Sequence, residues 1–115
     1  MTTFILVHRA PQGYRGSPET MARWNDWFER LGANLVDPGN PVFERRTVGN
    51  CGTGTVLGGY TLITAENREA AVALAEGCPL LAEGGGVEVG EFAPGPKERA
   101  ASFTYTATVF LRRRY

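Results

Sequence analysis

Apolar and polar residues follow two different periods along the chain, and the period predicts the type of each element. Residues 3–9 form a short apolar and β-branched run, which predicts a strand buried on at least one face. Residues 17–32 carry the signals of a helix: a serine N-cap, a proline in the first turn and a closing glycine. The apolar side chains of this helix recur at helical spacing, at Met21, Trp24, Trp27, Phe28 and Leu31.

The rest of the first ninety or so residues divides in the same way. We expect strands over residues 34–37, 56–64 and 86–92, a helix over residues 68–76, and a return to extended structure over residues 42–48. Residues 80–85 are expected to form a linker before the last of these strands. Gly58 and Gly59 interrupt the long strand, which favours a β-bulge there. The order βαββαβ predicts an α+β, ferredoxin-like fold with both helices on one face of a single sheet.

The end of the chain departs from this order. Pro94, Gly95 and Pro96 form a linker, and residues 102–111 then alternate between apolar and hydroxyl side chains, which predicts an additional C-terminal strand. We therefore expect a ferredoxin-like domain over residues 1–92 and a C-terminal extension over residues 93–115. Because two helices cover only one face of the sheet, we also expect a homodimer, with the extra strand pairing at a sheet edge of either subunit.

Composition narrows the class of partner. The chain of 115 residues has 12 basic and 12 acidic side chains, and this balance gives no general electrostatic basis for binding nucleic acid or an anionic membrane. Its apolar runs are too short to span a bilayer, and the first residues do not form a secretory leader, so we expect a cytoplasmic protein. Cys51 and Cys78 are expected to be free thiols. A single histidine makes a metal site improbable, and we expect no cofactor.

An ordered set of short motifs resembles the YCII-related domain family, in particular its small bacterial members. The matching residues lie between positions 3 and 92 and include Trp24, Trp27-Phe28, Leu31-Gly32-Ala33, Leu35-Val36-Asp37-Pro38-Gly39-Asn40-Pro41, Gly59-Tyr60, Ala71-Val72, Leu74-Ala75, Gly77-Cys78-Pro79-Leu80 and Gly85-Gly86-Val87-Glu88-Val89. The resemblance implies a ferredoxin-like fold that pairs into a dimeric α/β barrel, with a pocket between the sheet and the second subunit. It also implies a His-Asp pair in the best-known branch. Asp37 takes the aspartate position here, but Thr20 stands where the histidine would be.

His8 is the candidate that replaces the missing histidine. Strand alternation places it on the same face as Phe4 and Leu6, and an imidazole near the Asp37 carboxylate would be suited to proton transfer. We predict His8 and Asp37 as catalytic residues, in a pocket on the sheet face that the helices leave open. The candidate substrate-binding residues are Tyr60, Glu88, Arg9 and Asn40. Each of these residues also has a structural explanation, such as strand packing or turn formation.

Three functions remain open on the sequence alone. The first is a cofactor-free lyase, isomerase or cyclase that acts on a small organic molecule by acid-base catalysis. The second is a non-catalytic, small-ligand-binding or regulatory dimer. The third is a cofactor-free oxygenase, an expectation that depends on analogy between folds alone.

Overall fold

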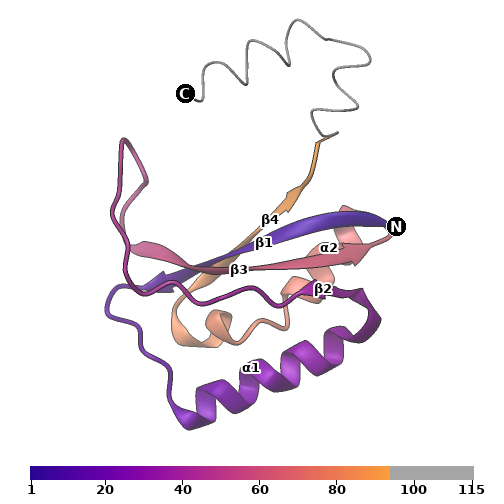
Figure 1. Cartoon of the computed structure of the whole chain (residues 1–115), viewed down its shortest axis with the longest axis horizontal. Helices are drawn as coiled ribbons and strands as arrows, with labels where there is room; N and C mark the ends of the chain where they lie inside the picture. The colour runs from indigo at the N-terminus through magenta and orange to yellow at the C-terminus, as the bar shows by residue number, and fades with distance from the viewer. Residues whose placement is uncertain (94–115) are drawn as a thin grey trace, which may run out of the picture.

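A computed structural model describes residues 1–93 of the chain, so the predicted strand over residues 102–111 lies outside the described part. Four antiparallel strands form one sheet: β1 (Thr2–Pro11), β2 (Leu35–Asp37), β3 (Thr55–Ala65) and β4 (Gly86–Glu91). Their order across the sheet is β2-β3-β1-β4, and with the two helices between them they make the predicted ferredoxin-like fold (Figure 1).

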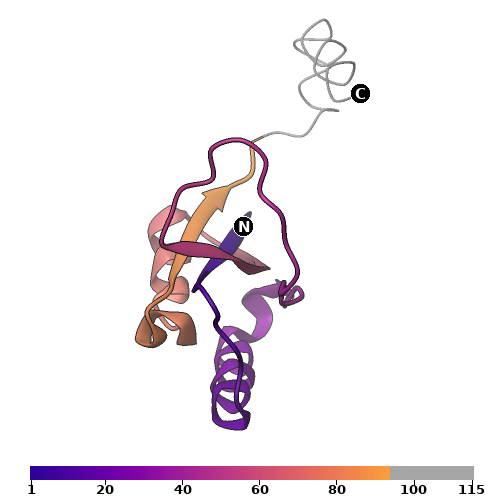
Figure 2. The ribbon, with the colours of Figure 1, turned by 90° about the vertical axis from the view of Figure 1, so that its left-hand side faces the viewer.

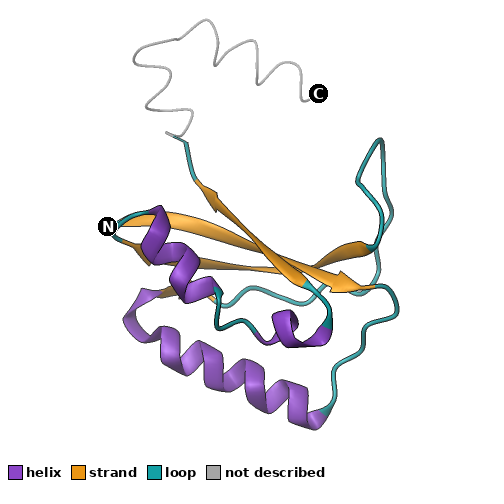
Figure 3. Cartoon of the chain, turned by 180° about the vertical axis from the view of Figure 1, so that it is seen from behind, coloured by secondary structure: helices purple, strands orange, loops and turns teal. Residues whose placement is uncertain are grey.

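Helices α1 (Pro18–Leu31) and α2 (Arg68–Ala75) both pack on one face of this sheet, as predicted (Figure 3). Serine at position 17 caps α1 by accepting a hydrogen bond from the Thr20 amide, and Asn67 caps α2 in the same way. Alternate side chains of β1 and β3 are buried beneath the helices, where they meet Trp27 and Leu31 of α1 and Ala71 and Ala75 of α2. The core therefore forms between the helices and this one sheet face.

The predicted bulge is present in β3. The pairing of β1 with β3 passes from His8 opposite Gly59 to Arg9 opposite Leu57, so Gly58 is the extra residue. A side chain at position 58 would also meet the Ala10 side chain at 3.1 Å.

Two local expectations were wrong. Residues 42–48 do not resume a strand; an isolated bridge between Pro41 and Gly59 is followed by a loop that reaches β3 and extends away from the sheet (Figure 2). The Arg45 guanidinium occupies the backbone acceptors at the base of this loop, donating to the carbonyls of Val42 and Leu57. The second correction concerns residues 80–85, which were expected to be a linker. Most of this segment belongs to a 3-10 helix, η2 (Pro79–Glu83).

No helix within residues 1–93 is long and apolar enough to cross a membrane.

Candidate functional site

A cavity of about 300 Å³ lies between α1, residues 38–43 and one end of β1 and β3. Its walls are mainly aromatic and apolar, and include Tyr14, Met21, Trp24, Phe28, Phe43 and Leu80. A few polar side chains interrupt this lining: His8, Thr20, Asn25, Asn40 and Arg45. Mostly apolar walls with a few polar groups are the usual make-up of a site for a small organic molecule.

The cavity lies on the sheet face that the helices cover, which corrects the prediction of a pocket on the opposite face. His8 follows Phe4 and Leu6 along β1, and all three side chains are buried beneath the helices. An open sheet face supplies only one wall, whereas α1 and residues 38–43 supply the second wall that a cavity needs.

The hydrogen bonds around His8 define its tautomer. His8 Nε2 lies 2.8 Å from Thr61 Oγ1, and the Thr61 hydroxyl donates to the carbonyl oxygen of Pro38 at 3.1 Å. Since a carbonyl only accepts, the single hydroxyl hydrogen of Thr61 is directed to Pro38, and His8 Nε2 must carry the hydrogen of the first bond. Nδ1 is then the unprotonated nitrogen, and it faces the Cys78 sulfur at 3.8 Å.

Burial keeps both members of the His8–Cys78 contact neutral. Desolvation lowers the pKa of His8 to about 4 and raises the pKa of Cys78 to about 11. The thiol therefore donates to the imidazole, and an ion pair of thiolate and imidazolium does not form at neutral pH. Cys51, the other thiol, is also free, as expected, and it is exposed.

Two tryptophans meet the His8 ring edge-on, with ring centroids 5.0 Å away for Trp24 and 5.9 Å away for Trp27. Trp27 is a core residue, as the helical spacing predicted, because it is buried and its indole N–H donates to the Leu74 carbonyl. Trp24 is only partly buried and lines the cavity, so it belongs to both the core and the candidate site.

Asp37 is engaged in the turn that follows β2. Its Oδ1 accepts a hydrogen bond from the Gly39 amide at 2.8 Å, which is the local role of aspartate before a turn. No hydrogen bond among residues 1–93 joins Asp37 to His8. The polar partners of His8 are instead Thr61 and, through it, the carbonyl of the neighbouring Pro38.

The same turn forms the rim of the cavity. Gly39 has a φ of +74°, and a Cβ atom there would lie 1.8 Å from the carbonyl oxygen of Tyr60. Only glycine allows this close approach, which brings residues 38–43 against β3. Asn40 and Tyr60 both belong to the cavity lining beside this turn. Tyr60 pairs with Val7 and alternates with the buried Gly59 and Thr61, so its side chain is directed toward the helix-free face at the edge of the site.

Glu88 and Arg9 do not contribute to the cavity lining. Glu88 is exposed and pairs across the sheet with Val7, whose side chain points away from the helices. Arg9 shares that strand face, and its guanidinium donates to the hydroxyl and carbonyl oxygens of Thr55. The cavity lining thus includes His8, Asn40 and Tyr60, but not Glu88 or Arg9.

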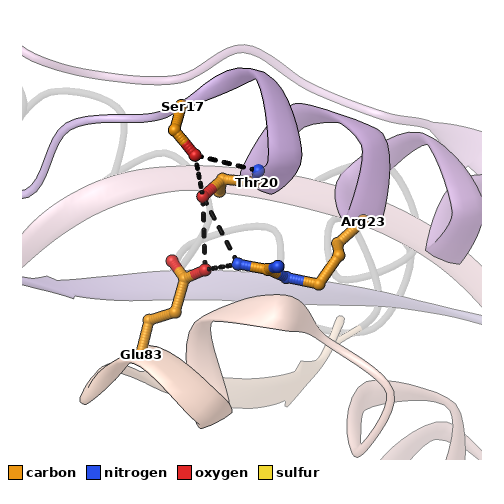
Figure 4. A network of polar contacts seen from close by, with 4 residues as sticks. All are labelled: Ser17, Thr20, Arg23 and Glu83. Carbon is orange, nitrogen blue, oxygen red and sulfur yellow. Dashed lines mark hydrogen bonds and ion pairs between the residues drawn. The ribbon is translucent and has the colours of Figure 1, made fainter.

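A polar cluster that sequence reasoning missed lies where α1 begins. The Arg23 guanidinium forms an ion pair with Glu83 Oε2, and the Thr20 hydroxyl contacts both Ser17 and Glu83 (Figure 4). The neighbouring Tyr14 phenol and Arg23 hold the pKa of Glu83 below its ordinary value. Glu83 was overlooked because it lies sixty residues from Arg23 in a segment that resembled a linker.

Within residues 1–93, no three His, Cys, Asp or Glu side chains gather in a way that would hold a metal ion.

Neither a protein-family model nor a curated protein sequence matches this chain. Among solved structures, it is similar to 5-chloro-2-hydroxyhydroquinone dehydrochlorinase of Burkholderia phenoliruptrix AC1100, in complex with 2,5-dihydroxybenzoquinone. The two chains are 19% identical over 80% of this chain and 95% of the other, with a TM-score of 0.48.

Proposed function

We propose that this protein binds a small organic molecule with a flat, largely apolar body in the cavity beneath α1. The observation that carries the proposal is the lining itself, in which Trp24, Phe28 and Phe43 provide aromatic contact surface. The volume of about 300 Å³ lies at the lower end of the range for small-molecule sites, about 300–1,000 Å³.

A cofactor-free enzyme that works by proton transfer is the second candidate, and it depends on His8. The imidazole lines the cavity and is unprotonated at neutral pH, as a proton acceptor must be. Both of its nitrogens have partners, however, and a pKa of about 4 makes it a weak base. Binding is therefore the better-supported function. A lyase, isomerase or cyclase activity of the YCII-related kind would additionally require His8 to accept a proton from the bound molecule.

We further propose that the protein is a homodimer that pairs through the helix-free sheet face. Ile5, Val7 and Leu62 alternate with the buried residues of β1 and β3 and thus share this face. A second copy of the chain would cover them, and the burial of apolar surface contributes about 25 cal/mol per Å². Light scattering checks the mass, and Val7→Glu should shift a dimer toward the monomer.

The binding proposal is tested with 2-naphthol and naphthalene as probes, followed by the indole N–H signals of the two tryptophans. We expect each probe that binds to shift the Trp24 signal more than the Trp27 signal, because Trp24 lines the cavity and Trp27 is buried in the core. If neither probe shifts the Trp24 signal at saturating concentration, the proposed function is wrong.

A matched pair of variants locates the binding. Phe43 and Phe92 are similarly exposed, at 48% and 50%, but only Phe43 lines the cavity. Phe43→Ser should weaken probe binding severalfold, and Phe92→Ser should leave it unchanged. Equal effects of the two substitutions would place the probes elsewhere on the surface.

A further inference from the structure

Among residues 1–93, Arg45 is the one side chain of the cavity lining that is charged at neutral pH. The lining that this part of the chain provides contains no aspartate, glutamate or lysine. His8 also lines the cavity, but burial lowers its pKa to about 4, so its imidazole is neutral. The described walls therefore carry one positive charge and no negative charge.

Two hydrogen bonds hold the Arg45 side chain in place and use only part of its donors. Nε donates to the Leu57 carbonyl at 2.9 Å, and Nη2 donates to the Val42 carbonyl at 2.8 Å. A guanidinium carries five N–H hydrogens, so both hydrogens of Nη1 and one of Nη2 have no acceptor within the described chain. Because the two backbone carbonyls already fix this group, a ligand that binds it loses little affinity to the ordering of the side chain.

The charge of Arg45 is not compensated by the part of the chain that the structure describes. Neither of the two ion pairs there includes it, and Glu44, the next residue in the chain, is exposed and forms none with it. The carboxylate of Glu83, near the start of α1, is paired with Arg23. Arg45 is half-buried, and charges that are partly buried are screened less than charges on an open surface. An anion in the cavity would thus meet an uncompensated positive charge.

We propose that the cavity selects aromatic carboxylates, with the ring against the aromatic wall and the carboxylate at the free N–H groups of Arg45. This proposal rests on the proposed binding function and adds the chemical class of the ligand. Phe43 lies two residues before Arg45, so one small aromatic acid can contact both side chains. A planar carboxylate accepts two parallel hydrogen bonds from a guanidinium, which favours it over a neutral group. Asn40 lines the cavity from the same connection, and its amide N–H groups are further donors for the carboxylate.

The experiment compares 2-naphthoate, 2-naphthamide and naphthalene at pH 7 and low salt, in titrations followed by the Trp24 indole signal. The amide has nearly the size and shape of the acid but no charge. We expect 2-naphthoate to bind at least about tenfold more tightly than 2-naphthamide, because hydrogen bonds between charged groups are stronger than those to a neutral group. Equal affinity for the acid and the amide, or tighter binding of the amide, would overturn the proposal and leave the binding function intact. If none of the three compounds binds, the proposed function itself has failed.

Two adjacent arginines provide the variant and its matched control. Arg45→Gln removes the charge from the lining and should reduce the preference for 2-naphthoate to less than about threefold. Arg46→Gln removes the same charge one residue further on, from an exposed side chain outside the lining, and should keep the preference. The preference is a ratio of two affinities in one variant, so a change in cavity shape that weakens both compounds cancels.

Arg45→Lys covers the case in which the glutamine variant loses the loop and binds neither compound. Lysine keeps the positive charge but not the planar fork, so the preference should lie between those of wild type and Arg45→Gln. A full preference in Arg45→Gln, or the same loss of preference in Arg46→Gln, would place the recognition of the carboxylate elsewhere.

Discussion

His8 Nε2 and Thr61 Oγ1 lie 2.8 Å apart in the buried layer beneath α1, in neighbouring strands. Because the Thr61 hydroxyl donates its hydrogen to the Pro38 carbonyl, this contact holds the imidazole as the Nε2–H tautomer. It also links β1 and β3 to the turn at residues 38–43, which forms the rim of the cavity. The sole histidine of the chain is therefore a neutral, oriented group in this structure.

The first prediction concerns the pH dependence of stability. The pKa of His8 is about 4 in the folded protein, below its ordinary value of 6.5, because burial disfavours the charged imidazolium. Between pH 6.5 and 4 the unfolded chain therefore takes up a proton that the folded protein does not. Stability should thus fall as the pH drops from 6.5 toward 4, by about 2 kcal/mol between pH 7.5 and 5. Urea denaturation at several pH values measures it.

The His8→Gln variant supplies the comparison, since it lacks the titrating group. The difference in unfolding free energy between wild type and variant should itself depend on pH across this window. A constant difference between pH 7.5 and 5 would contradict the buried, neutral state of His8. The lowered pKa of Glu83 acts below its ordinary value of 4.5 and does not interfere.

A second prediction tests the hydrogen bond through Thr61. Thr61→Val preserves the shape of the side chain but leaves His8 Nε2–H and the Pro38 carbonyl without their partner, which should destabilise the protein by about 2 kcal/mol. Thr64→Val is the matched control on the same strand, because Thr64 is only partly buried and its hydroxyl bond is long, at 3.5 Å. Similar melting temperatures for the two variants would show that the buried hydrogen bonds of Thr61 contribute no more to stability than the bond of Thr64.

The third prediction separates steric contact from backbone strain at the rim. Gly39 and Gly49 have nearly equal φ values of +74° and +75°, but a Cβ atom meets Tyr60 only at position 39. Gly49→Ala should cost about 1 kcal/mol from the left-handed backbone alone, and Gly39→Ala should cost at least about 2 kcal/mol more. Chemical denaturation gives both values, and equal losses would mean that residues 38–43 are not pressed against β3.

The fourth prediction is a difference in thiol reactivity. Cys51 is exposed, whereas burial raises the pKa of Cys78 to about 11 and shields its sulfur from reagents. A thiol-specific reagent at pH 8 should therefore modify one cysteine quickly in the native protein and both in denaturant. Rapid modification of Cys78 in the native state would show that the layer beneath α1 opens readily.

The sequence predicted the sheet and both helices because those elements depend on local signals. The spacing of Trp24, Trp27 and Leu31 and the Ser17 cap define α1 without reference to the rest of the chain. Alternation likewise placed His8 on the face of Phe4 and Leu6, which the structure confirms.

The candidate site was less predictable, since its walls depend on contacts between distant segments. Alternation tells which residues share a strand face, but not which face α1 covers, so the pocket was expected on the wrong side. The neighbours Tyr14 and Glu83 come from two segments without a regular pattern, and nothing in either segment points to the other. Asn40 and Tyr60 were candidates because of the polar groups that they carry, in a turn and in a strand, and both belong to the cavity lining.

The two hydrogen bonds of Arg45 divide the connection from β2 to β3 into two parts. The two parts should differ in how well they tolerate inserted residues. Beyond Arg45 the chain is exposed from residue 46 to residue 54, so a longer tip would add mainly loop entropy, and doubling its length costs only about 0.6 kcal/mol. Residues 38–43 have no such freedom, because an insertion there would displace the wall of the cavity. A reporter peptide or an affinity tag therefore has a natural position near Asn50, where the chain accepts added sequence and the cavity keeps its shape.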